Sequence, residues 1–176
     1  MIEMTKVYKK YPNGIVAANG IDVNIKQGEF VYVVGPSGAG KSTFIKMMYR
    51  EERPTSGTII VNGMNLATLK NKNVPYLRRQ IGVVFQDFKL LPRLNVYENV
   101  AFALEVIEES PKVIRKKVMD VLELVGLKNK ARMFPTELSG GEQQRVSIAR
   151  SIVNTPKLVI ADEPTGNLDP ETSWEI

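Results

Sequence analysis

The sequence contains no cysteine and no histidine among its 176 residues. Without cysteine the fold cannot depend on disulfide bonds, which allows a reducing compartment. No apolar run approaches the roughly 18 residues of a membrane span. The N-terminal segment MIEMTKVYKK also lacks the apolar stretch of a secretion signal. We therefore expect a soluble, cytoplasmic protein that reaches a membrane only through a partner.

The composition is that of an ordinary soluble protein, with 43% hydrophobic and 24% charged residues. A net charge of +5 permits an acidic partner or an anionic membrane surface but requires neither. The length suits one domain, or one domain with a subdomain, and is sufficient for a buried core. No internal repeats or low-complexity segments are present.

The pattern of apolar residues predicts an α/β fold. Residues Phe30–Val34 are apolar on both faces, as in a strand inside a parallel sheet. Helical periodicity follows Ser110 and Pro111 up to Gly126, and also covers Tyr97–Val106. Strands are predicted over Ile2–Tyr8, Ile21–Ile25, Phe30–Val34, Thr58–Val61, Ile81–Phe85 and Leu158–Ala161. We expect a single domain over 1–176, with an N-terminal antiparallel sheet and a helical insertion at about 90–140.

The run GPSGAGKST at Gly35–Thr43 has the spacing G-x-x-x-x-G-K-S of a phosphate-binding loop. Glycines let the backbone wrap around triphosphate oxygens, and the following helix points unpaired N–H groups at the same anion. Lys41 adds a charge for the β- and γ-phosphates, and Ser42 a hydroxyl for Mg²⁺. A plain glycine-rich turn is the alternative. The predicted contacts are Gly35, Pro36, Ser37, Gly38, Ala39, Gly40, Lys41, Ser42 and Thr43.

The segment LSGGEQQR, Leu138–Arg145, predicts a second helix N-terminus. Ser139 and Glu142, three residues apart, predict a capping box. Two glycines beside the cap leave backbone N–H groups uncovered, so this terminus is also a predicted anion site. Two such termini in one chain are hard to reconcile with one nucleotide held by one subunit.

LSGGEQQR resembles the signature motif of the ATP-binding-cassette (ABC) ATPases, which are P-loop NTPases. In that family two domains pair head to tail, and each ATP lies between the phosphate loop of one subunit and the signature of the other. The resemblance implies a homodimer that binds ATP or ADP with Mg²⁺. It implies that Ser139 and Gly141, with Gly140 between them, contact the nucleotide of the partner subunit. The implied fold has an antiparallel β subdomain, a parallel-sheet core and an inserted helical subdomain.

Two further segments match catalytic motifs of the family. LVIADE, ending at Glu163, resembles the Walker B strand, in which Asp162 holds Mg²⁺ through water and Glu163 polarises the attacking water. Gln86 follows the strand IGVVF and matches the Q-loop glutamine, which contacts Mg²⁺ and water. The implied catalytic residues are Lys41, Gln86 and Glu163, and the implied metal ligands are Ser42, Gln86 and Asp162.

Other matches concern the base and the partners. Asn167–Asp169 matches the D-loop, which crosses to the second subunit. Tyr11 stands where the family often stacks an aromatic ring on adenine, a contact worth about 1–3 kcal/mol per base. The alternative is that Tyr11 packs the N-terminal sheet. Phe88, Leu90 and Leu91 are candidates for contact with a membrane partner, or they simply anchor the helical insertion.

Within the family, the segments GVVFQDFKLLP, VYENVAFALEVI and IADEPTGNLDPETSWEI resemble the ATPase of a bacterial cell-division complex. This implies a membrane-protein partner, a location on the inner face of the cell membrane, and control of peptidoglycan hydrolases instead of solute transport. The basic stretches Lys112–Lys117 and Arg78–Arg79 either face anionic lipid or form a solvated surface.

The sequence departs from the family pattern at its end. The switch histidine that follows the D-loop and the closing strands are not found before Ile176. We expect a fragment of a longer protein that binds nucleotide but turns it over weakly, with an unpaired edge on the central sheet.

Three rival functions have less support in the sequence. A DNA-repair ABC protein would insert a long coiled coil between Gln86 and the signature, and a ribosome-acting one would join two cassettes. A small-molecule kinase has no use for LSGGEQQR. A scaffold role with ATP as an assembly signal and slow hydrolysis stays open.

Overall fold

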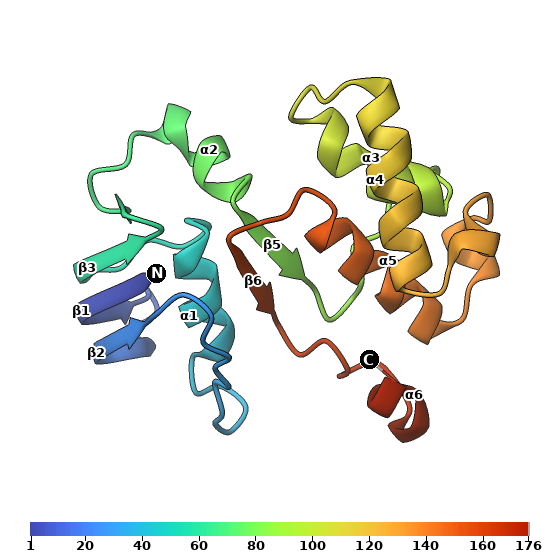
Figure 1. Ribbon diagram of the computed structural model, residues 1–176. Coiled ribbons are helices and arrows are strands. Elements are labelled where there is room, and N and C mark those ends of the chain that lie inside the picture. Colours follow the sequence, from blue (N-terminus) through green and yellow to red (C-terminus); the bar gives the residue numbers. More distant parts are fainter. Residues whose placement is uncertain (176) are drawn as a thin grey trace. The chain divides into compact units, whose positions relative to one another are not determined.

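Figure 1 shows the computed structural model, which describes residues 1–175. The chain divides into two compact units, Met1–Arg78 and the remainder from Arg79 onward. Each unit contains its own sheet. Within residues 1–175, no helix combines the length and the apolar character that crossing a bilayer would require.

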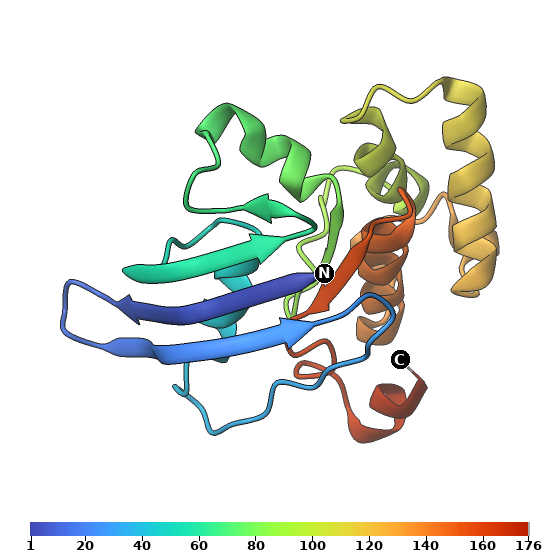
Figure 2. The same cartoon turned by 60° about the vertical axis from the view of Figure 1, so that its left-hand side comes forward.

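The first unit is built on a four-stranded antiparallel sheet in the order β2-β1-β3-β4, seen from the side of its long strands in Figure 2. Its strands are β1 (Ile2–Lys10), β2 (Val16–Ile25), β3 (Ser56–Val61) and β4 (Met64–Asn65). A turn before Gly14 joins β1 to β2, and the Gly14 amide donates to the Tyr11 carbonyl at 2.9 Å. An Asn62–Gly63 turn, a sequence typical of hairpins, joins β3 to β4, with φ of 50° and 78° at its two residues.

The core of the first unit starts from alternation along β1. Ile2 and Met4 are buried on one face, and a register shift between Met4 and Val7 returns Val7 to that face. Helix α1 (Lys41–Met48) contributes the buried side chains of Phe44, Ile45, Met47 and Met48. The unit ends with a 3₁₀ turn, η1 (Asn71–Asn73), and the short helix α2 (Val74–Arg78).

The prediction of a strand over Phe30–Val34 is wrong. These residues have no regular secondary structure, and Phe30, Tyr32 and Val34 are 82%, 80% and 86% exposed. A strand needs a neighbour for its N–H and C=O groups, and neither sheet of residues 1–175 pairs with this segment. Phe30 and Tyr32 instead contact each other edge to face, with ring centroids 4.9 Å apart.

The second unit contains a parallel pair of strands, β5 (Ile81–Val84) and β6 (Leu158–Ala161). The predicted parallel core is therefore present as two strands among the described residues. Helix α5 (Gly140–Ile152) packs closely on β5, because a Cβ at Gly82 would lie 2.2 Å from the Ser151 carbonyl oxygen. A short helix, α6 (Pro170–Glu175), closes the described chain.

Helices α3 (Val96–Glu105), α4 (Pro111–Leu124) and α5 enclose one apolar cluster. The predicted helices over Tyr97–Val106 and after Ser110 are confirmed, and Gly126 follows α4 with φ 72°. Two 3₁₀ turns, η2 (Lys128–Lys130) and η3 (Pro135–Glu137), link α4 to α5. The cluster continues to Val153, beyond the end that we predicted for the helical insertion near residue 140, because α5 supplies part of its wall.

Candidate functional site

The phosphate loop leads into α1 through Gly40, which has φ 92° and no side-chain cap. A Cβ at this position would lie 2.1 Å from the carbonyl oxygen of Ala17 on β2, so only glycine fits. The loop is also closed internally by the Ala39 amide, which donates to the Pro36 carbonyl at 3.2 Å. Gly40 makes no side-chain cap hydrogen bond, and a helix N-terminus that follows a glycine-rich loop is the kind of place where proteins bind anions.

The Lys41 ammonium lies over its own loop. Its Nζ donates to the carbonyl oxygens of Gly35 at 3.0 Å and Pro36 at 3.2 Å. A lysine ammonium held beside the loop backbone in this way can form charge-assisted hydrogen bonds with the oxygens of a polyphosphate. The predicted contacts Gly35–Thr43 are thus brought together in one loop, and their contact with nucleotide stays a prediction.

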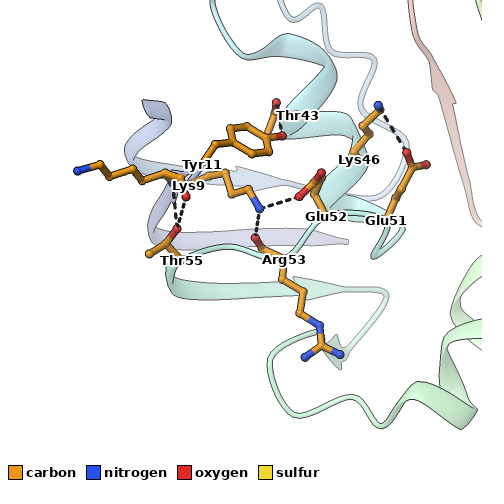
Figure 3. A network of polar contacts seen from close by, with 9 residues as sticks. Lys9, Tyr11, Thr43, Lys46, Glu51, Glu52, Arg53 and Thr55 are labelled. Atoms are coloured by element: carbon orange, nitrogen blue, oxygen red, sulfur yellow. Dashed lines mark hydrogen bonds and ion pairs between the residues drawn. The ribbon is translucent and has the colours of Figure 1, made fainter. Parts of the chain in front are cut away.

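Tyr11 lies just beyond β1 and is tied to the start of α1. Its hydroxyl lies 3.1 Å from the Thr43 hydroxyl, as Figure 3 shows. On the ring face, the Lys9 ammonium lies 4.7 Å from the ring centroid. Tyr11 is half-buried, so it both packs at the end of the sheet and lies beside the phosphate loop.

The carboxyl ends of β5 and β6 lie at the same edge of their sheet, since Val84 pairs with Ala161 in parallel. Asp162 directly follows β6, and Gln86 lies two residues after the end of β5. The Asp162 amide donates to the Val84 carbonyl at 3.0 Å. Glu163 is exposed, with φ 48°. Ligands of open α/β sheets bind at this kind of edge, which agrees with the predicted roles of these residues.

A reciprocal amide pair joins the loops that follow the two strands. Asn167 donates from Nδ2 to the Gln86 carbonyl at 2.9 Å, and Gln86 Nε2 lies 3.4 Å from Asn167 Oδ1. A Cβ at Gly166 would lie 2.7 Å from the same Gln86 nitrogen. The predicted Q-loop and D-loop residues are therefore in direct contact within the second unit.

The predicted capping box at the signature is confirmed. Ser139 Oγ accepts from the Glu142 amide at 3.3 Å, and the Glu142 carboxylate accepts from the Ser139 amide at 3.0 Å. Lys130 also donates to this carboxylate. The hydrogen bond from Lys130, followed by that from the Ser139 amide, holds the pKa of Glu142 below its usual value.

Replacing Lys130 with Met is expected to reduce the free energy of unfolding by about 1 kcal/mol at pH 7. Because the folded pKa of Glu142 lies below the unfolded one, its stabilisation is complete above about pH 5 and is lost as the pH falls through the folded value. Urea unfolding at pH 7 and pH 3.5 measures this, and the difference between variant and wild type should shrink at the lower pH.

The matched control is Lys128→Met, since Lys128 pairs with Glu123 on an exposed surface, at 2.9 Å. It should change stability by less than about 0.5 kcal/mol at either pH. An equal loss at both pH values in Lys130→Met would contradict the assigned role of Glu142.

The three signature residues differ in exposure. Ser139 and Gly140 are exposed, whereas Gly141 is buried. A Cβ on Gly141 would lie 2.3 Å from Thr172 Cγ2 of α6. The Asp169 carboxylate accepts hydrogen bonds from the hydroxyl and the amide of Thr172. These two hydrogen bonds hold Thr172 in place and lower the pKa of Asp169. Contact of Gly141 with a second subunit therefore requires α6 to move, while Ser139 and Gly140 are open as they stand.

Three positioning residues were not assigned from the sequence. Gln144 lies inside the quoted motif, is completely buried, and donates to the Pro164 carbonyl beside Glu163. Arg150 donates to the carbonyls of Phe88 and Lys89. Asn99 is buried and bonds the Leu91 backbone. The periodicity of their helices places each on an inner face, but only the folded chain shows what each side chain contacts.

The predicted metal ligands are a hydroxyl, an amide and a carboxylate, from Ser42, Gln86 and Asp162. Each side chain offers an oxygen donor of the kind that Mg²⁺ prefers, and their joint binding of one ion stays a prediction. Residues 1–175 contain no group of three or more carboxylate, imidazole or thiol side chains that could hold a metal by themselves. Other oxygens, such as those of a bound polyphosphate, would have to complete the coordination.

A family model described as "ABC transporter" matches residues 18–166. The chain belongs to the ABC transporter family. Relatives that match over all of this chain include the cell division ATP-binding protein FtsE of Bacillus subtilis, which is 73% identical and is covered over 77% of its own length. FtsE of Mycobacterium tuberculosis is 53% identical over the whole chain and 77% of its own length.

Solved ABC structures share the fold. The dimeric cassette MJ0796, in a post-hydrolysis state bound to ADP and Pi, has a TM-score of 0.89 at 37% identity, covering 100% of this chain and 79% of that one. CbiO1 from Clostridium perfringens also has a TM-score of 0.89, at 34% identity over 99% of this chain and 69% of that one. The α/β P-loop fold of an ABC ATPase is thus confirmed.

Proposed function

We propose that this ABC ATPase domain is the ATP-hydrolysing subunit of a membrane complex of the FtsE–FtsX type, which acts in bacterial cell division. The observation that carries the ATPase part is the phosphate loop, where only glycine fits at Gly40 and Lys41 lies over the loop carbonyls. The identity of 73% with an FtsE protein supports the cell-division part. In this proposal the membrane partner is FtsX, through which ATP use controls peptidoglycan hydrolases.

Each candidate residue has a proposed role in ATP turnover. The loop amides and Lys41 bind the β- and γ-phosphates, and Ser42, Gln86 and Asp162 supply oxygen ligands. Mg²⁺, when bound, neutralises phosphate charge during transfer. Glu163 accepts a hydrogen bond from the attacking water and orients it. Gln144 fixes the backbone next to Glu163 through the Pro164 carbonyl, so the carboxylate keeps its direction.

The proposed assembly is a head-to-tail homodimer. Two observations support it: Ser139 and Gly140 are exposed at the N-terminus of α5, and the related cassette MJ0796 forms a dimer. In the proposal Ser139, Gly140 and Gly141 complete the nucleotide contacts of the second subunit. The D-loop residue Asp169, which caps α6, then controls access to Gly141.

Contact with FtsX is assigned to the loop after Gln86, on the cytoplasmic side of the membrane. Leu91 is 37% exposed, whereas Leu90 packs against the helical apolar cluster. We therefore propose that Leu90 anchors the loop to the helical cluster, whereas Leu91 is available for contact with the membrane partner. The location proposed is peripheral, on the inner face of the membrane, with no nucleic acid involved.

A second candidate is the ATPase of another ABC system, of the lipoprotein or macrolide exporter type, or a scaffold with little hydrolysis. It is kept because MetN of Helicobacter hepaticus, named a methionine import ATP-binding protein, is 47% identical over the whole chain, so this degree of similarity is not confined to cell-division proteins. Co-expression with FtsX or with an exporter membrane subunit, followed by detergent pull-down, separates these. Retention of the exporter subunit alone would refute the FtsX assignment.

Lys41→Ala should lower the affinity for Mg·ATP by roughly 10- to 100-fold, since it removes charge-assisted bonds to phosphate. Equilibrium titration of the purified chain measures this. Lys46→Ala is the matched control, because Lys46 lies on the same helix and pairs only weakly with Glu51, at 3.5 Å. Unchanged ATP affinity in Lys41→Ala would refute the proposed loop function.

A further inference from the structure

Lys9 is a charged side chain with an unusually complete set of contacts. Its side chain is only 13% exposed. Its Nζ donates to Glu52 Oε2 at 2.6 Å and to the Arg53 carbonyl at 2.9 Å. The same ammonium lies 4.7 Å from the centroid of the Tyr11 ring. Figure 3 shows these contacts converging beneath the ring.

Lys9 lies near the end of β1, and Tyr11 follows the strand's last residue. The pairing with β2 is irregular between Lys9 and Lys10, and the fold brings the lysine and the tyrosine together there. Removing an ammonium from water is costly unless it is paired and hydrogen-bonded. Glu52 and the Arg53 carbonyl, which follow α1, supply that pairing and fix the charge against one face of the ring.

The ring is therefore held in two ways. The Thr43 hydroxyl lies 3.1 Å from the tyrosine hydroxyl, and Lys9 covers one face. Thr43 belongs to the first turn of α1, so the ring is connected to the phosphate loop through that helix. A planar ligand that stacks on Tyr11 must use the face opposite Lys9.

We propose that Lys9 is a positioning residue for the nucleobase, which selects the ring face of Tyr11 that an adenine stacks on and strengthens that stacking. The inference rests on the proposed function, because it requires ATP at the phosphate loop. A cation on one face of an aromatic ring attracts its π electrons, which makes the opposite face a better partner for an electron-rich purine. Glu52 keeps the cation in place.

The alternative is that Lys9 only joins β1 to the segment after α1. Comparison of two ligands separates these roles: Mg·ATP, which has a base, and Mg·tripolyphosphate, which has none. Lys9→Met keeps the aliphatic stem and removes the charge. It should weaken Mg·ATP binding by about threefold to tenfold and leave tripolyphosphate binding unchanged. Lys9→Arg, which keeps a cation over the ring, should restore most of the ATP affinity.

Two controls frame the titration. Lys10→Met makes the same charge change at an exposed neighbouring position and should alter neither affinity. Tyr11→Ala should weaken Mg·ATP binding by about tenfold or more, again with tripolyphosphate unaffected. Thermal unfolding of each variant establishes that it is folded. If Lys9→Met does not fold, Glu52→Gln replaces it and should lower the ratio of ATP affinity to tripolyphosphate affinity by about twofold.

Each outcome decides the inference. An equal loss of both ligands in Lys9→Met, or no loss of ATP affinity while Tyr11→Ala loses it, overturns the role of Lys9. Unchanged ATP binding in Tyr11→Ala overturns it as well, since no base then stacks there. In all three cases the proposed ATPase function stands, because that function is tested separately by the ATP affinity of Lys41→Ala.

Discussion

Gly40→Ala should reduce the affinity for Mg·ATP by at least about 100-fold and the free energy of unfolding by about 3 kcal/mol. Two effects add at this position. A φ of 92° is strained for any residue with a side chain. The new Cβ would also lie 2.1 Å from the Ala17 carbonyl oxygen of β2, so the loop must move away from the strand and its amides lose their common direction.

Gly63→Ala is the matched control for this prediction. Gly63 lies in the β3–β4 turn with φ 78°, and a Cβ added there would have no other atom within 4 Å. The substitution should cost about 1 kcal/mol from strain alone and leave ATP affinity unchanged. Urea unfolding and ATP titration measure both variants. If Gly40→Ala were no worse than Gly63→Ala in both measurements, the close approach to Ala17 would have no role in the loop.

Arg150→Met should lower the free energy of unfolding by about 2–4 kcal/mol. The guanidinium of this α5 residue donates to the carbonyls of Phe88 and Lys89, both at 2.7 Å. These two consecutive residues have φ of 57° and 49°, a conformation that residues other than glycine rarely adopt. Burial partly removes the guanidinium from water and thereby lowers the pKa of Arg150, and a charge in such a place is costly unless it is hydrogen-bonded. Replacing Arg150 removes both hydrogen bonds that its guanidinium donates to the strained Phe88–Lys89 turn.

The predicted loss has a signature at the turn itself. Amide hydrogen exchange should accelerate at residues 87–91 in Arg150→Met, and replacing Lys89 with Gly in that background should recover about 1 kcal/mol by relieving strain. Arg115→Met, on the exposed side of α4, makes the same charge change and should be within about 0.5 kcal/mol of wild type. A variant at Arg150 as stable as the one at Arg115 would contradict the holding role.

Local structural features that depend on a few neighbouring residues could be predicted from the sequence. The capping box of Ser139, the Asn62–Gly63 hairpin and the apolar run of β6 each depend on neighbours within a few positions, and the structure contains all three. Strand β2 begins at Val16 instead of Ile21, because pairing with β1 extends it through an Ala-Asn-Gly stretch that has little strand preference of its own.

Features that depend on distant partners were not predictable. The apolar run Phe30–Val34 has the composition of a buried strand, but composition does not reveal whether a second strand lies beside it. Lys9, Gln144 and Arg150 are ordinary polar residues in the sequence, and their roles come from a ring, a proline carbonyl and a turn that the fold brings to them. The burial of Gly141 under Thr172 likewise required the position of α6.

The tight fit of Gly82 against the Ser151 carbonyl has a mechanical consequence. Because the strand and the helix are packed with so little spare volume, we expect β5 and α5 to move together as one rigid unit. Arg150, near the C-terminal end of α5, binds the Phe88–Lys89 turn. Ser139 lies at the N-terminal end of the same helix, about 16 Å away at 1.5 Å per helical residue. Because α5 is one continuous helix, a displacement of the turn would shift Ser139 as well.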